Sequence, residues 1–359
     1  MRKIAAFLFA ISLFISGIYS QTLEIEWGNF MELDKDQYIQ DIVGGNEDGF
    51  YVLRSNNITG CGNARTWIDY YNATMFSPES SSELLMPSVN GMETSFGKLY
   101  YIDGKLILFT ILVDEHRNQR IAYVQYINSD GTLKNKPREI GQLPIQNGPY
   151  SFNYELSGDG KKIMFYYFNY FQTYNGEEII IKILDASLQE EFSKKLVLPL
   201  KERQFELLDF QLGKSGNIYI SAKLARESKK GRSSTDAGTE FGIITYNRKK
   251  NDFYIETVEM KKNEPSSIIF GLDKDENIVV GGLYSYKTAR SGEIYGAFYQ
   301  TINPNTQKVI RGTAEDKESL IDFSRDRDFM NQFTYKRFGD PNYFYRYILK
   351  DIFFLDNGG

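Results

Sequence analysis

The chain has 359 residues and a formal net charge of −5, with acidic and basic residues interspersed along its length. This balance gives neither the basic stripe of a nucleic-acid-binding protein nor a polybasic membrane patch. One histidine and one cysteine exclude a multi-histidine metal site, a thiolate zinc site and an intrachain disulfide. We therefore expect no cofactor, no metal and no nucleic-acid partner.

The first twenty residues have the pattern of a secretory signal peptide, with cleavage predicted after Ser20. Arg2 and Lys3 precede an apolar run from Ile4 to Ile15, and small or polar residues follow. That run is shorter than the ~20 residues that cross a bilayer, so no transmembrane segment is expected in the mature chain. The sequence predicts a signal peptide (1–20) and one all-β domain (21–359) in a secreted, periplasmic or cell-surface protein.

A turn followed by an apolar strand recurs along the mature chain. The turn glycines Gly49, Gly104, Gly160 and Gly216 are 55, 56 and 56 residues apart, and a looser copy places Asn277 61 residues further on. Gly and Asn suit tight hairpins because such turns need a positive φ. This regular spacing predicts a repeated structural unit.

Each unit is expected to open with a hairpin, since an apolar segment also precedes every turn. These first strands are 39–43, 97–101, 151–156, 205–212 and 268–272, and a third and a poorer fourth strand follow, as in 121–127, 178–184 and 253–260. Four antiparallel strands in ~50 residues match a propeller blade. The second strands are almost continuously apolar, which indicates that both faces are covered and favours a β-propeller over a sandwich or a β-solenoid.

One repeat carries a family resemblance. The segment from Leu156 to Phe165, with Ser157-Gly158-Asp159-Gly160, resembles the WD40-like repeat of the TolB type of bacterial propeller, and Leu272 to Gly281 is similar to repeats of other secreted bacterial propellers. The resemblance implies the propeller fold. It implies no activity, because propellers include both binding proteins and enzymes.

The rhythm changes near the end of the chain. Apolar residues set among charges between Thr313 and Tyr343 suit helical turns, so a small helical insertion is expected near 313–340. A strand pattern returns at Tyr347 to Leu355, and the turn residues 356–359 follow it. We expect five blades and the start of a sixth, in a chain truncated at its C-terminus or completed by another chain.

Candidate chemistry is sparse, and no catalytic or metal-binding residue is assigned. His116 lies in the charged segment 114–119 and is interpreted as a solvated turn residue. Asp273, Asp275 and Asn277 have the alternate spacing of a calcium loop, but Ile278 and Tyr284 stand where that loop needs Gly and Glu. These carboxylates are expected to shape a hairpin instead.

Three further segments have two interpretations each. The aromatic run Phe165 to Phe171 is either a sugar-stacking platform or, the preferred interpretation, a buried second strand. Cys61 is interpreted as a loop residue and not as a reactive thiol, and the polar stretch Arg226 to Thr239 as a mobile loop and not as a binding loop.

Three functions remain open, and the ligand-binding residues are unknown. The first is a non-catalytic binding or scaffold propeller for an unknown protein or glycan. The second is a carbohydrate-active hydrolase or lyase that uses carboxylates, or a Tyr beside an Arg, with two acids ~5–9 Å apart across a funnel. The third is a module of a larger surface adhesin.

Overall fold

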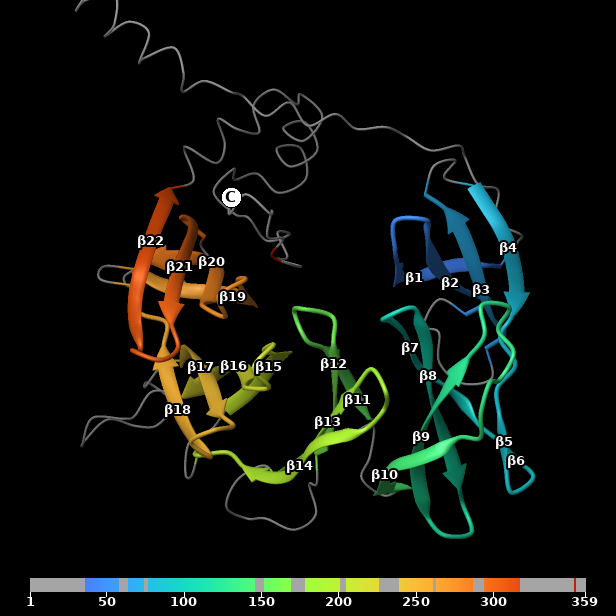
Figure 1. Ribbon diagram of the computed structural model, residues 1–359. Coiled ribbons are helices and arrows are strands. Elements are labelled where there is room, and N and C mark those ends of the chain that lie inside the picture. Colours follow the sequence, from blue (N-terminus) through green and yellow to red (C-terminus); the bar gives the residue numbers. More distant parts are fainter. Residues whose placement is uncertain are drawn as a thin grey trace, which may run out of the picture. The chain divides into compact units, whose positions relative to one another are not determined.

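The computed structural model describes residues 36–57, 64–73, 77–145, 152–168, 178–200, 205–225, 239–260, 263–286 and 294–316, together with Ile352. Within these ranges the chain forms five antiparallel sheets of four strands each (Figure 1). No helix of the described ranges has the length and apolarity needed to cross a membrane. The five sheets confirm the five predicted repeats.

The sheets follow one another along the sequence. Sheet 1 contains β1 (Tyr38–Gly45), β2 (Gly49–Ser55), β3 (Thr66–Asn72) and β4 (Ser77–Glu83). Sheet 2 contains β7 (Ser95–Ile102), β8 (Lys105–Asp114), β9 (Gln119–Ile127) and β10 (Arg138–Pro144), and the short hairpin β5 (Ser88–Val89) and β6 (Met92–Glu93) precedes it. Sheet 3 contains β11 (Asn153–Leu156), β12 (Lys162–Phe168), β13 (Glu178–Asp185) and β14 (Glu190–Val197). Sheet 4 contains β15 (Phe205–Leu212), β16 (Ile218–Ala225), β17 (Thr239–Asn247) and β18 (Asp252–Thr257), and sheet 5 contains β19 (Asn263–Leu272), β20 (Ile278–Tyr286), β21 (Gly296–Asn303) and β22 (Lys308–Asp316).

Every sheet is a meander in which each strand pairs with the next one along the chain. The two middle strands are the most buried, as β16 and β17 show. The fourth strands are more exposed, as β14 shows. This gradient follows from the sequence, because the second and third strands are the apolar ones. By their contacts, sheet 1 forms one compact unit, and the residues from Leu85 onward form a second unit.

Three of the five predicted hairpin turns have the expected glycine conformation. Gly104, Gly160 and Gly216 have φ values of 73°, 67° and 83°. Asp103, with φ 48°, precedes Gly104, so β7 and β8 are joined by a two-residue turn with both central residues left-handed. The sequence spacing thus identified real hairpin turns.

The prediction of positive φ is wrong at the first and last turns. Gly49 does not have positive φ; it begins β2, and a Cβ on it would lie 2.2 Å from the Tyr71 carbonyl oxygen, so close strand approach explains this glycine. In the last turn the left-handed residue is Glu276, with φ 60°, and not its neighbour Asn277. Asn277 instead donates from its side chain to Asp273.

The expected helical insertion is corrected where the structure describes it. Thr313 to Asp316 belong to β22, whose register opposite β21 continues to Asp316. The remainder of the expected insertion, residues 317–340, lies outside the described residues, as does the signal peptide. The expected sixth repeat also lies outside them, except for Ile352, whose Cδ1 is 3.5 Å from the position of a Cβ on Gly281.

In the second unit, neighbouring sheets pack face to face. One apolar cluster joins sheets 2 and 3 around Phe109 and Phe165. A second joins sheets 3 and 4 around Ile181 and Ile220, and a third joins sheets 4 and 5 around Tyr219 and Val280. Both faces of sheets 3 and 4 are therefore covered, as their continuous apolar strands predicted.

The first strands of sheets 3, 4 and 5 lie beside one another. β11 contacts β15, and β15 contacts β19. Gln211 of β15 donates from Nε2 to the Phe270 carbonyl of β19 at 2.7 Å. Register shifts also interrupt the first strands: there are two in β1 and one each in β7, β15 and β19. Bulges turn side chains away from the regular alternation and are frequent at sheet edges and beside functional sites.

Candidate functional site

The edge formed by β11 and β15 brings an acidic pair to one tyrosine. Glu155 of β11 pairs with Met164 of β12, and Tyr166 lies two residues further along β12 on the same face. Asp209 belongs to the neighbouring strand β15, immediately after its bulge at Leu208. Asp209 is exposed, and Glu155 and Tyr166 are half-buried, so the group is open to solvent.

Burial and the two carboxylates change the pKa of the Tyr166 phenol in the same direction. Burial raises the pKa of the Tyr166 phenol above its usual range, and the negative charges of Glu155 and Asp209 raise it further. A phenol is neutral at neutral pH even with its ordinary pKa, so Tyr166 has a hydroxyl that can donate a hydrogen bond, near two carboxyl groups that can accept one. We call Glu155, Tyr166 and Asp209 the acidic edge site.

An aromatic stack supports the acidic edge site. The ring of Phe210, the residue after Asp209, lies against the Tyr166 ring with centroids 4.4 Å apart and planes 23° from parallel. Phe168 meets Phe210 edge-on at 5.8 Å. Phe210 is 5% exposed and belongs to the cluster between sheets 3 and 4, so packed side chains hold the tyrosine in place.

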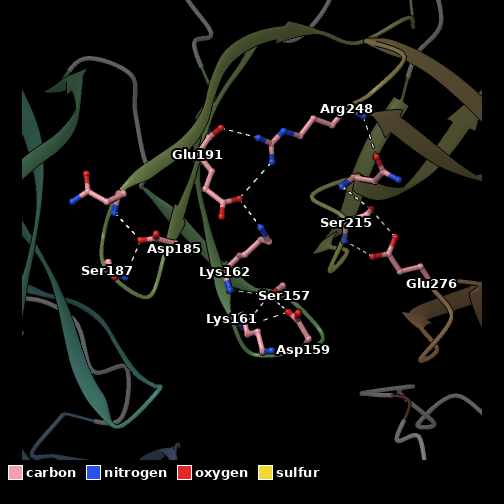
Figure 2. Close-up of polar contacts among 12 residues, drawn as sticks. Ser157, Asp159, Lys161, Lys162, Asp185, Ser187, Glu191, Ser215, Arg248 and Glu276 are labelled. Carbon is pink, nitrogen blue, oxygen red and sulfur yellow. Dashed lines mark hydrogen bonds and ion pairs between the residues drawn. The ribbon is translucent and has the colours of Figure 1, made fainter.

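A second group of polar residues lies on the hairpin turns and joins sheets 3 and 4 (Figure 2). Glu191 of β14 receives Lys162 Nζ at 2.5 Å and Arg248 Nη1 at 3.6 Å. Arg248, which follows β17, also donates from Nη2 to the Glu191 carbonyl at 2.7 Å and lies 5.2 Å from the Phe192 ring centroid. These contacts tie the two sheets together.

Sheets 4 and 5 are joined by a turn-to-turn contact (Figure 2). The Glu276 carboxylate accepts from Ser215 N at 2.5 Å and from Ser215 Oγ at 2.7 Å. Tyr219 donates to the same carboxylate at 3.5 Å. Glu276 is only 8% exposed, so this contact is a buried link between sheets 4 and 5 at their turns.

Sheet 1 has its own buried ion pair. Arg54 of β2 and Asp69 of β3 are hydrogen-bonded in a two-point contact, with side chains 12% and 2% exposed. Arg54 also donates to Ser81 and to Gln37, and its guanidinium lies 6.0 Å from the Trp67 ring centroid. With both charges compensated and fixed by neighbours, this pair is a structural element of the sheet.

The residues singled out in the sequence occupy separate places. His116 is exposed in the turn between β8 and β9, well separated along the chain from the acidic edge site. Asp273 accepts backbone N–H groups from Asp275 and Asn277, each at 2.8 Å, which is the hairpin-shaping role expected for it. Among the described residues no group of three or more His, Cys, Asp or Glu side chains could hold a metal ion.

The preferred interpretation of the aromatic run, a buried second strand, holds for Phe165 and Tyr167, while Tyr166 and Phe168 of the same strand are half-buried. Phe165 is fully buried and Tyr167 is 7% exposed, both within β12. Residues 169–171 lie outside the described residues, as do Cys61 and positions 226–238 of the polar stretch. Thr239, the last residue of that stretch, begins β17.

Sequence reasoning did not identify the acidic edge site. A weak signal was present, because Glu155 and Asp209 are carboxylates in mostly apolar strands that precede the turns at 157–160 and 213–216, but Glu206 has the same character in β15. What the sequence lacked was the adjacency of β11 and β15, which brings two repeats together.

Comparisons with known proteins give no family. No family model matches the chain, and no curated protein matches it. Among solved structures, the Penicillium chrysogenum alpha-L-arabinanase is 11% identical with a TM-score of 0.38, over 74% of this chain and 90% of that one. The Bacteroides thetaiotaomicron endo-arabinase is 10% identical with a TM-score of 0.31, over 72% and 95%. The β-propeller domain of the Trilobed protease from Pyrococcus furiosus is 11% identical with a TM-score of 0.38, over 75% and 80%.

At such identities and scores these likenesses carry no argument about activity. The class of the protein follows from its own repeats: four-stranded meanders, packed sheet on sheet, with adjoining first strands in the second unit. The chain is an all-β repeat protein of the β-propeller type.

Proposed function

We propose that this chain is an exported propeller that binds carbohydrate at the acidic edge site. The observation that carries the proposal is the contact between β11 and β15, which brings the Glu155 and Asp209 carboxylates within electrostatic reach of the Tyr166 phenol on β12. Carboxylates accept hydrogen bonds from neighbouring hydroxyls of a sugar, and a neutral phenol supplies a donor. Export after removal of residues 1–20, and a TolB-type relationship, belong to the same proposal.

The ligand class is argued from charge. Two carboxylates at one exposed edge, in a chain of net charge −5, disfavour anionic ligands such as nucleic acids or phosphorylated molecules. A neutral polyhydroxyl ligand can form hydrogen bonds to carboxylates and to a phenol without bringing charge. A basic peptide is the competing ligand, and its binding would fall steeply with added salt.

Binding is tested with soluble polysaccharides, including arabinan, xylan and glucomannan, by affinity electrophoresis and calorimetry on the mature chain. We expect Glu155→Gln and Asp209→Asn each to weaken binding about tenfold, as loss of a charged hydrogen bond worth ~1.5 kcal/mol implies. Glu206→Gln, a change of an exposed carboxylate on the same strand β15, is the matched control. Unchanged affinity in both site variants would refute the assignment.

Carbohydrate cleavage is the second candidate, and the acidic pair itself favours it. Glycosidases place two carboxyl groups on opposite sides of the scissile bond, one as acid and one as nucleophile or base. In this case Glu155→Gln and Asp209→Asn would abolish release of reducing sugars while the protein still bound the polysaccharide. If the unchanged chain bound the polysaccharide but released no product, cleavage would be refuted and the binding function would stand.

A further inference from the structure

A pair of tyrosines at the end of β20 has no part in the acidic edge site. Tyr286, the last residue of β20, is 44% exposed. Its ring lies 4.3 Å from the Tyr295 ring, centroid to centroid, with planes 51° apart. Covering such an exposed ring with a ligand would bury apolar surface. The contact with Tyr295 already holds one side of the ring in place.

The supporting ring is anchored. The backbone N–H of Tyr295 donates to the Tyr284 carbonyl at 2.8 Å, which extends the pairing of β20 and β21 beyond its last ladder position. Tyr295 also packs against the apolar cluster between sheets 4 and 5. The pair is therefore held by the fold, and Tyr286 is the ring left open to solvent.

A polar group lies directly across from the open ring. Asn263 of β19 pairs with Tyr286, which places the two side chains on the same face of sheet 5, ~4.5–5.5 Å apart at Cβ. An amide beside an aromatic face offers a donor and an acceptor at the edge of an apolar surface. This is the combination that a sugar ring needs, because its C–H face is apolar and its rim is hydroxylated.

We propose that Tyr286, supported by Tyr295 and flanked by Asn263, is a stacking subsite for one sugar ring of a polysaccharide. The inference rests on the proposed carbohydrate binding and adds a second contact, on sheet 5. The tilt of the pair leaves one ring-sized surface and not a groove between parallel rings. A proline-rich peptide, which docks in aromatic-lined grooves, fits this geometry less well.

The test uses the mature chain and the polysaccharide bound most tightly by the unchanged protein. Tyr286→Ala should weaken binding by about two- to tenfold, the loss expected for a well-placed aromatic contact, and Tyr286→Phe should retain most of the affinity. Tyr299→Ala is the matched control, since Tyr299 is 39% exposed but the Arg311 guanidinium lies 5.9 Å from its ring centroid.

A second readout places the ligand on the ring. Nitration of the unchanged protein, read by peptide mass spectrometry, should modify Tyr286 in the free protein and spare it when polysaccharide is bound, while Tyr299 reacts equally in both. Binding lost in Glu155→Gln but unchanged in Tyr286→Ala would overturn the subsite and leave the proposed function standing. No binding by the unchanged chain would overturn both, and protection of Tyr286 by a proline-rich peptide alone would overturn the sugar assignment.

Discussion

Replacing Glu276 by glycine sets two opposing effects against each other. Glu276 has φ 60°, in the turn where the two preceding repeats have Gly160 and Gly216. Its carboxylate accepts two hydrogen bonds from Ser215 in the neighbouring sheet. Glycine relieves the backbone conformation and removes the contact between the sheets.

The structure indicates which effect is larger. A left-handed conformation costs a non-glycine residue ~1–2 kcal/mol, but glycine loses ~0.5–1 kcal/mol more conformational entropy on folding, so relief is worth ~0.5–1 kcal/mol. Hydrogen bonds to a charged group contribute ~1.5–3 kcal/mol each, and we take ~2 kcal/mol for the pair because water can reach the exposed Ser215. Glu276→Gly should therefore lower the free energy of unfolding by ~1 kcal/mol.

The assay is urea unfolding of the mature chain, followed by tyrosine fluorescence and far-UV circular dichroism. Glu276→Gln is the matched variant, because it keeps the strained backbone and weakens only the acceptor; it should also lose stability. A Glu276→Gly protein that unfolds at higher urea than the unchanged chain would show that strain outweighs the contact and would refute the reasoning.

Three further outcomes are expected. Asp69→Asn should lower the free energy of unfolding by ~3–5 kcal/mol in the same urea assay, because it leaves the Arg54 charge buried without its partner. Gln125→Leu should raise the urea midpoint, because Gln125 is fully buried and its amide atoms have no hydrogen-bond partner among the described residues; a lower midpoint would contradict this. Burial raises the pKa of Tyr154 above the ordinary 10.0, so the unfolded chain loses this proton first and stability should fall as pH rises above about 10. Tyr154→Phe should reduce that fall, measured as the urea midpoint against pH, and an unchanged slope would contradict it.

The fold could be predicted from the sequence because its signal repeats. The glycines at 104, 160 and 216 each need a left-handed turn, and the apolar strands on either side leave little choice but a hairpin. In the fifth repeat the prediction of a left-handed Asn277 failed. Glu276 has the left-handed conformation there, and its carboxylate contacts Ser215 of the preceding repeat, which no local sequence pattern reveals. Local propensity cannot predict the backbone conformation of a residue whose side chain is stabilised by contacts with another repeat.

The acidic edge site could not be predicted for a related reason. Glu155 and Asp209 are 54 residues apart in the sequence, and each alone resembles an ordinary polar residue near a strand end. Their common effect on Tyr166 depends on which strands adjoin, and that is a property of sheet packing. The helical insertion expected near 313–340 is wrong at its described residues 313–316 for the opposite reason, since strand pairing with β21 outweighed a mixed polar and apolar pattern.

Among the described residues, the links between turns join sheet 3 to sheet 4 and sheet 4 to sheet 5. The stability of this part of the chain therefore depends on each sheet and on its interfaces with the neighbouring sheets, as in other repeat proteins. A break between two sheets separates the chain at that point without loosening the interfaces on either side. For evolution, this means that a repeat can be duplicated or lost when the two turns that then meet fit each other, as the turns that carry Ser215 and Glu276 do.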